Sequence, residues 1–271
     1  MTRTLRHALG ACLIAVPLLV ALLGPFAVDG PTERSAAFTV TPGTPLGTDF
    51  VGRDVLEQVL LGGRSVIVVA IAATVIAYLI GVPIAILAAT SARRRIDELL
   101  MRPLDVVLAI PSLLLVLLVA SAVPGGAVTL TLVVAVITAP DVARVARAAA
   151  LEVASRPAME AMRLYGETWW RRGVRYTTRA LLRVLAADAG LRLTGALYLV
   201  ASASFLGVGF APDASNWAVM VDRNRAGLFL APWSVVLPAL LIVALTVGTN
   251  LVFDSALDRT ETLQRRPWRR A

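Results

Sequence analysis

Apolar residues along this chain are gathered in long uncharged runs, separated by polar segments. A membrane-spanning helix needs about 20 mostly apolar residues, and five of the runs reach that length. One of them, from Val106 to Pro140, is too long for a single helix and is interrupted at Pro124-Gly125-Gly126, where proline and glycine favour a turn. The pattern predicts six spans, at residues 9–28, 65–92, 104–123, 127–146, 191–210 and 233–253.

The predicted spans leave polar segments at residues 29–64, 147–190 and 213–232. The first apolar run follows Arg3 and Arg6, as in a secretory signal peptide. It is longer than the roughly 7–15 apolar residues of such peptides, and no clean A-x-A-like site follows it. We therefore predict a retained anchor helix.

The composition supports a membrane protein and excludes several other classes. Hydrophobic residues make up 58% and charged residues 16%, with a mean hydropathy of +0.77; soluble domains have about 45–50% apolar and about 25% charged residues. Cys12 and His7 are the only residues of their types, which excludes a disulfide framework and a Cys/His zinc site. The sequence has no lysine and therefore no Walker A motif for ATP.

The distribution of arginine predicts the orientation of the chain. A net charge of +8 and a pI near 11.0 would also suit a nucleic-acid-binding protein. With the N-terminus inside, however, 21 of the arginines face the cytoplasm and 5 face outward, as the positive-inside rule requires. We expect both termini in the cytoplasm and no nucleic-acid partner.

Few ionisable residues fall within the predicted spans. Asp141 and Arg144 lie near the cytoplasmic end of the fourth span, and Arg192 lies near the same end of the fifth. We interpret them as snorkelling side chains or an interface pair, because the centres of the other spans carry no charge to couple to ions. The sequence has no H-E-x-x-H or G-x-S-x-G motif, so we predict no catalytic and no metal-binding residues.

The polar segment after the fourth span has the pattern of a short helix. Pro157 suits the first turn of a helix and Gly166 its C-terminal end. Between Pro157 and Gly166, four small or apolar residues follow the i, i+3, i+4, i+7 spacing of one helix face: Ala158, Ala161, Met162 and Tyr165. Two interpretations remain open. The helix either lies on the membrane, anchored by Trp169 and Trp170, or docks in a groove on a cytoplasmic partner.

This segment resembles the "EAA" loop of the permease subunits of ABC importers, whose pattern is E-A-A-x3-G-x9-I-x-L-P. In that family the loop forms a coupling helix that sits in a cleft of the ATPase subunit. The resemblance assigns this role to Glu160, Ala161, Met162, Tyr165 and Gly166. Met162 replaces a small residue, and the I-x-L-P ending falls on Tyr176, Thr177, Thr178 and Arg179.

Other segments resemble the C-type permeases of the dipeptide/oligopeptide/nickel family. Residues 47–56 are similar to its G-T-D-x-x-G-R-D-V-L segment, and residues 204–220 are similar to its S-F-L-G-x-G…P…W-G-x-M segment, with Ala218 in place of the glycine that follows the tryptophan. Residues 97–112 match its second cytoplasmic loop and third span, and residues 254–259 match its closing D-x-L-x-D-P-R without the proline. The family positions, which we expect to be structural, are Gly47, Asp49, Gly52, Arg53, Asp54, Ser204, Phe205, Gly207, Gly209 and Trp217. Direct ligand contact by residues 47–54 is the alternative to a structural turn.

The resemblance implies an all-α membrane protein with six transmembrane helices, the type I ABC importer (MetI-like) permease fold, and a cytoplasmic coupling helix. Residues 1–63 would form an anchor helix and external loop, and residues 64–271 the permease domain. The chain would be half of the translocation pathway of an ATP-driven peptide importer in the bacterial inner membrane.

The implied partners are a second permease subunit, two ATPase subunits that bind ATP and magnesium, an extracytoplasmic solute-binding protein and membrane lipid; the chain itself would hold no cofactor. Import of nickel chelates or heme is the alternative within the family. A membrane scaffold, an embedded enzyme and a secondary transporter are the alternatives outside it. The sequence identifies no substrate-binding residue.

Overall fold

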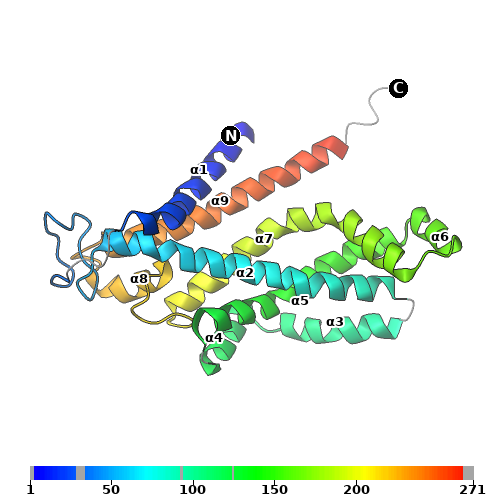
Figure 1. The fold of residues 1–271 in the computed structure, drawn as a ribbon, viewed down its shortest axis with the longest axis horizontal. Helices are drawn as coiled ribbons and strands as arrows, with labels where there is room; N and C mark the ends of the chain where they lie inside the picture. The colour runs from blue at the N-terminus through cyan, green and yellow to red at the C-terminus, as the bar shows by residue number, and fades with distance from the viewer. Residues whose placement is uncertain (1–2, 29–33, 92–93, 124, 265–271) are drawn as a thin grey trace.

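A computed structural model describes the backbone of residues 3–28, 34–91, 94–123 and 125–264, and the side chains of residues 8–28, 34–91, 95–123 and 125–253. This part of the chain is helical and contains no strand, which confirms the predicted all-α class (Figure 1). The helices are α1 (Arg3–Leu23), α2 (Val55–Thr90), α3 (Arg94–Leu108), α4 (Ser112–Ala122), α5 (Gly126–Ala154), α6 (Pro157–Leu164), α7 (Thr177–Phe205), α8 (Trp217–Asn224) and α9 (Trp233–Gln264). A π-helix, Trp170–Tyr176, leads directly into α7, and 3-10 turns occupy Gly24–Phe26 and Arg225–Gly227.

Within the described residues, five helices are long and apolar enough to cross a membrane, and a bent pair brings the number to six if it counts as one span. The five are Ala8–Phe26, Val55–Thr90, Gly126–Ala154, Trp170–Phe205 and Trp233–Phe253. They overlap the first, second, fourth, fifth and sixth spans that the sequence predicts.

The third predicted span, 104–123, is not one straight helix. Helix α3 ends at Leu108 and α4 begins at Ser112, and the two axes differ by 90°. Pro111 caps α4 with φ −56° and ψ 120°. A proline lacks the N–H that a continuous helix would need there and disfavours a helical residue before it, so the chain turns at this point.

The polar segments are shorter than the sequence predicts. Helix α5 continues to Ala154 and the π-helix begins at Trp170, so only residues 155–169 separate them instead of residues 147–190. Helix α2 already begins at Val55, so position 63, the expected domain boundary, lies inside it. The expected loop 213–232 contains α8. Charges mark where a helix leaves the hydrocarbon region and not where it ends, which explains these differences.

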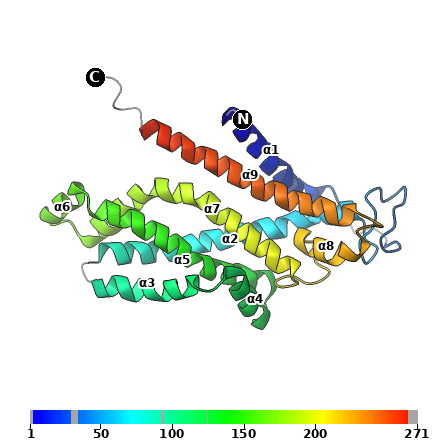
Figure 2. The same ribbon diagram turned by 180° about the vertical axis from the view of Figure 1, so that it is seen from behind.

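Helices α2 and α5 make the most extensive contact in the bundle, and α7 packs against both. Small residues line this contact: a Cβ on Gly81 would lie 2.7 Å from the Ala139 carbonyl oxygen, and Ala77, Ala139 and Ala143 are buried. Small side chains allow membrane helices to approach closely and gain dispersion energy. Helix α1 lies beside α9 in both views (Figure 1, Figure 2).

The two ends of the bundle carry different features. Helix α6 lies at one end, and α8 lies at the other with the loop of residues 34–54 (Figure 1, Figure 2). We refer to them as the α6 end and the α8 end. Arg93 and Pro124, and the side chains of the closing motif at residues 254–259, lie outside the described residues.

Candidate functional site

Helix α6 forms where the sequence predicts it. Pro157 occupies its first turn, and Gly166 follows it with φ +74°. The Gly166 N–H donates to the Arg163 carbonyl (3.1 Å) and the Glu167 N–H donates to the Met162 carbonyl (3.0 Å). These two bonds define a Schellman motif, which needs a left-handed residue at the glycine position. The prediction that Gly166 ends this helix is confirmed.

The apolar face of α6 differs partly from the predicted one. Met159 and Met162 are half-buried, whereas Ala158 and Ala161 are exposed. Leu164 and Tyr165 have exposed fractions of 82% and 88%. Leu164, which the sequence analysis did not select, is therefore exposed together with Tyr165. The result is an exposed apolar surface at the tip of the bundle.

The segment after α6 is fastened to the end of α2. The indole Nε1 of Trp169 donates to the Thr90 hydroxyl at 3.2 Å, and a Cβ on Gly173 would lie 3.0 Å from the same indole nitrogen. Trp170 remains 66% exposed. Trp169 thus joins the segment to the bundle while remaining 38% exposed, and Trp170 is the more exposed of the two.

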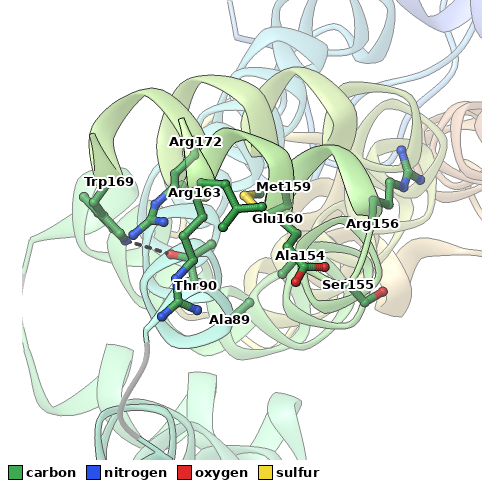
Figure 3. A pocket seen from close by; sticks show the side chains of 12 residues that line it. Ala89, Thr90, Ala154, Ser155, Arg156, Met159, Glu160, Arg163, Trp169 and Arg172 are labelled. Atoms are coloured by element: carbon green, nitrogen blue, oxygen red, sulfur yellow. Dashed lines mark hydrogen bonds between the residues drawn. The ribbon is translucent and has the colours of Figure 1, made fainter. Parts of the chain in front are cut away.

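A pocket of about 780 Å³ opens between α6 and the ends of α2 and α5 (Figure 3). Its polar rim is mainly basic, with Arg156, Arg163 and Arg172, and Glu160 is the one acidic side chain among its lining residues. Arg156 is paired with Glu152 at 3.0 Å, which raises the pKa of this arginine. The exposed apolar tip and the basic pocket adjoin each other, because Leu164 also lines the pocket.

Ion pairs join α5, the helix that precedes α6, to α3. Arg147 of α5 is paired with Asp97 of α3, and Arg144 of α5 is paired with Asp105 of α3. The pairing of Arg144 supports the interpretation that the charges near the fourth span are interface pairs.

Helices α2, α5 and α7 share a second polar cluster. Arg192 lies 3.2 Å from Asp188 and 3.5 Å from Asp141, and the Tyr78 hydroxyl donates to Asp188 at 2.8 Å. The sequence analysis missed Tyr78 and Asp188, although the i, i+4 spacing of Asp188 and Arg192 was a usable signal.

At the α8 end, Asp49 organises the loop that precedes α2. Its carboxylate, 2% exposed, accepts hydrogen bonds from the Val51 and Arg53 N–H groups and from the Arg53 Nε, all between 2.8 and 2.9 Å. Gly52 has φ +83°, and a Cβ there would lie 1.9 Å from the Ser35 carbonyl oxygen. Asp54 caps α2 by accepting from the Leu56 N–H at 2.9 Å. These groups are engaged within the protein, which supports the structural turn over direct ligand contact.

We expect Arg53→Ala to lower the amount of assembled complex more than it changes substrate affinity. The guanidinium also donates to the Asp213 carbonyl at 2.8 Å, so its loss releases the loop and leaves the buried Asp49 carboxylate without its charged partner, at a cost of about 3 kcal/mol. Size-exclusion yield and a substrate-binding titration measure the two effects. Arg225→Ala, which removes an exposed guanidinium at the same end, is the control. Normal assembly with weakened binding would instead identify a ligand-binding loop.

Trp217 is the main buried side chain at this end. It has no exposed surface, and its Nε1 donates to the Val59 carbonyl at 2.8 Å. A Cβ on Gly63 would lie 2.4 Å from the indole, and one on Gly62 would lie 2.9 Å from it. The glycine pair therefore makes the space that Trp217 fills. Sequence reasoning selected Trp217 but missed Gly62 and Gly63.

The segment around Ser204 ends α7. The Gly207 N–H donates to the Ser204 carbonyl and the Val208 N–H to the Ala203 carbonyl, which is a second Schellman motif with φ +80° at Gly207. Gly209 has φ +93° and packs on Leu130 of α5. Gly47, with φ +83°, packs on Ala231 in the same way. Phe205, by contrast, is 36% exposed.

Comparison with known proteins identifies the class. Residues 81–262 match the family model described as binding-protein-dependent transport system inner membrane component. Because the match covers more than half of the chain, the protein belongs to this family of ABC transporter permeases.

Named relatives narrow the comparison to peptide permeases. The chain is 29% identical over 264 residues to the di/tripeptide transport system permease protein DppC of Pseudomonas aeruginosa, with 93% of this chain and 87% of the relative covered. It is 31% identical over 214 residues to a putative peptide permease protein of Brucella abortus, with 78% and 70% covered. It is 27% identical over 213 residues to the glutathione transport system permease protein GsiD of Pectobacterium atrosepticum, with 79% and 70% covered.

Proposed function

We propose that this chain is the transmembrane subunit of an ATP-driven importer of peptides, and that α6 couples it to an ATPase subunit. The observation that carries the coupling role is the exposed apolar face of α6, with Leu164 and Tyr165 almost fully exposed at the tip of long packed helices. A helix of this kind suits a groove on a partner protein. The chain itself is a membrane component, and ATP and magnesium would be bound by the separate ATPase subunits.

The proposed mechanism is alternating access. Closure of the ATPase dimer on ATP would move α6. Because only a few residues link α6 to α5 on one side and to the π-helix before α7 on the other, its movement would pass to both helices. The Trp169–Thr90 hydrogen bond would pass it to α2 as well. The ion pairs between α3 and α5 favour movement of these helices as one body. The second permease subunit would supply the other half of the pathway, and a solute-binding protein would deliver the peptide.

Di- and tripeptides are the proposed substrates because the named relatives transport peptides or glutathione. Nickel chelates and heme are the alternatives within the family. The solute-binding protein would make most of the selection, so its binding preference is the measurement that separates these substrates.

The 21 to 5 split of arginine predicts that the α6 end faces the cytoplasm. Reporter fusions after Arg95 and Arg172 are expected to be cytoplasmic, and fusions near Thr44 and Asp213 external. The hydrogen bond between Arg53 and the Asp213 carbonyl supports this, because it brings the two expected external sites to the same end. A cytoplasmic reporter at Thr44 would contradict the six-span topology.

Purification of the chain from its native membrane tests the proposed function. We expect two ATPase subunits and a second permease to co-purify, with ATP hydrolysis that rises when a soluble binding protein loaded with trialanine is added. A chain that purifies alone, or an ATPase that does not respond to the binding protein, would favour a scaffold or an embedded enzyme.

A further inference from the structure

An open groove of about 490 Å³ lies in the α8 half of the bundle, between α7, α8 and α9, with Leu113 of α4 at its edge. None of its lining residues is charged. It therefore differs from the basic pocket beside α6. Most of its wall is aliphatic, and Phe205 and Leu206 lie at the end of α7.

Two hydroxyl groups of α7 interrupt this apolar wall. Tyr198 and Ser202 are four residues apart, so they lie on one face of the helix, and both line the groove. Tyr198 is 57% exposed and Ser202 is partly exposed. Neither side-chain hydroxyl has a hydrogen-bond partner among the described residues. Thr246, on the α9 side, instead donates to the Ile242 carbonyl at 2.8 Å.

An unpaired hydroxyl is costly in lipid, because the hydrocarbon region offers it no water. Tyr198 is about 10 Å along the helix from its end at Phe205, since α-helices rise 1.5 Å per residue. It therefore lies inside the candidate span Trp170–Phe205, about two turns from the end of the helix. Two unpaired hydroxyls on one face at this depth indicate water or a polar ligand in the groove.

We propose that this groove is a segment of the translocation pathway, in which the hydroxyls of Tyr198 and Ser202 exchange hydrogen bonds with the backbone amides of a passing peptide. The inference rests on the proposed peptide-import function and adds a substrate-contact site to it. Uncharged walls with a few neutral hydrogen-bonding groups suit this task, because a pathway must bind weakly enough to release what it conducts. The site would not favour a metal cation, since no lining residue is a carboxylate, imidazole or thiol.

Cysteine accessibility in the intact complex tests the presence of water. Cys12 is the only native cysteine, so Cys12→Ser gives a background for Ser202→Cys and for the control Val75→Cys. Val75 is 52% exposed on α2 and does not line the groove. Thiolates form in water and not in lipid. We expect a charged, membrane-impermeant methanethiosulfonate reagent to modify Ser202→Cys at least about tenfold faster than Val75→Cys, and trialanine with its binding protein and ATP to slow this reaction.

A transport measurement tests the hydroxyl itself. Tyr198→Phe removes one oxygen, and loss of one hydrogen bond predicts a roughly three- to tenfold lower uptake rate at limiting trialanine, with unchanged complex yield. Uptake equal to wild type would overturn the role of Tyr198.

Equal modification of Ser202→Cys and Val75→Cys, or modification that trialanine does not slow, would overturn the pathway assignment, since a groove filled by lipid or by the second permease gives these results. If the wild-type complex transports trialanine in that case, the proposed function stands without the site; absence of wild-type transport would contradict the function itself.

Discussion

Replacement of Ala161 by arginine is expected to lower the amount of ATPase that co-purifies with this chain at least about tenfold. Ala161 is exposed on the outward face of α6, beside Leu164 and Tyr165. A partner that packs there would have to desolvate the new guanidinium without pairing it, which costs more than the 1.4 kcal/mol that corresponds to a tenfold change in affinity. The spans are untouched, so membrane insertion should be normal.

The matched control is Ala148→Arg, which places the same side chain at an exposed position of α5 away from α6. It should retain the ATPase. The membrane-surface interpretation of α6 makes the opposite forecast for Ala161→Arg, because an arginine on a helix that lies on lipid can reach the headgroups. Full ATPase retention and normal uptake in this variant would refute the coupling role.

Gly166→Val tests the same site through the backbone. A Cβ at Gly166 meets nothing within 4 Å, so the whole cost comes from φ +74°, which a β-branched residue avoids. We expect α6 to lose its C-terminal cap and transport to fall, with hydrolysis no longer linked to uptake. Gly43→Val is the control, because a Cβ at Gly43 also meets nothing within 4 Å, and Gly43 does not have a positive φ.

Trp217→Ala should have the largest effect on stability. The indole is fully buried against Gly62 and Gly63 and donates to the Val59 carbonyl. Truncation of a buried aromatic side chain typically costs about 3–5 kcal/mol, through lost burial and the cavity that remains. Thermal unfolding of the purified complex should show a strongly lowered midpoint and a poor yield.

Trp233→Ala is the control for this prediction, since Trp233 is 47% exposed and should change the midpoint little. Gly63→Val should reproduce the effect of Trp217→Ala from the other side of the contact, because its Cβ would overlap the indole. A stable Gly63→Val variant would show that the indole is free to move, contrary to the packing described above.

Local signals in the sequence were sufficient to predict α6. Pro157 and Gly166 each act within one turn of the chain, so the helix and its cap follow from their conformational preferences alone. The structural role of Asp49, Gly52 and Arg53 was predicted for the same reason. Their partners, Ser35 and the Asp213 carbonyl, were not, since the chain brings them close only after folding.

Contacts between distant segments explain most of what the sequence analysis missed. Trp217 and Val59 are 158 positions apart, and no periodicity links a glycine pair in α2 with an indole in α8. The bend at Pro111 was missed because it lies within an uncharged run, and counting charges does not detect a turn there. The ends of α5 and α7 were misplaced for a related reason, since arginine-rich helices continue beyond the hydrocarbon region.

The central claim, import of peptides powered by ATP and coupled through α6, is tested most directly by uptake into vesicles. The complex is reconstituted with ATP inside and with radiolabelled trialanine and the solute-binding protein outside, as wild type, Ala148→Arg and Ala161→Arg. We predict ATP-dependent accumulation for wild type and Ala148→Arg, and accumulation at least about tenfold lower for Ala161→Arg. Equal, ATP-dependent accumulation by all three would contradict coupling through α6, and failure of an ATPase-competent wild-type complex to accumulate trialanine would contradict peptide import.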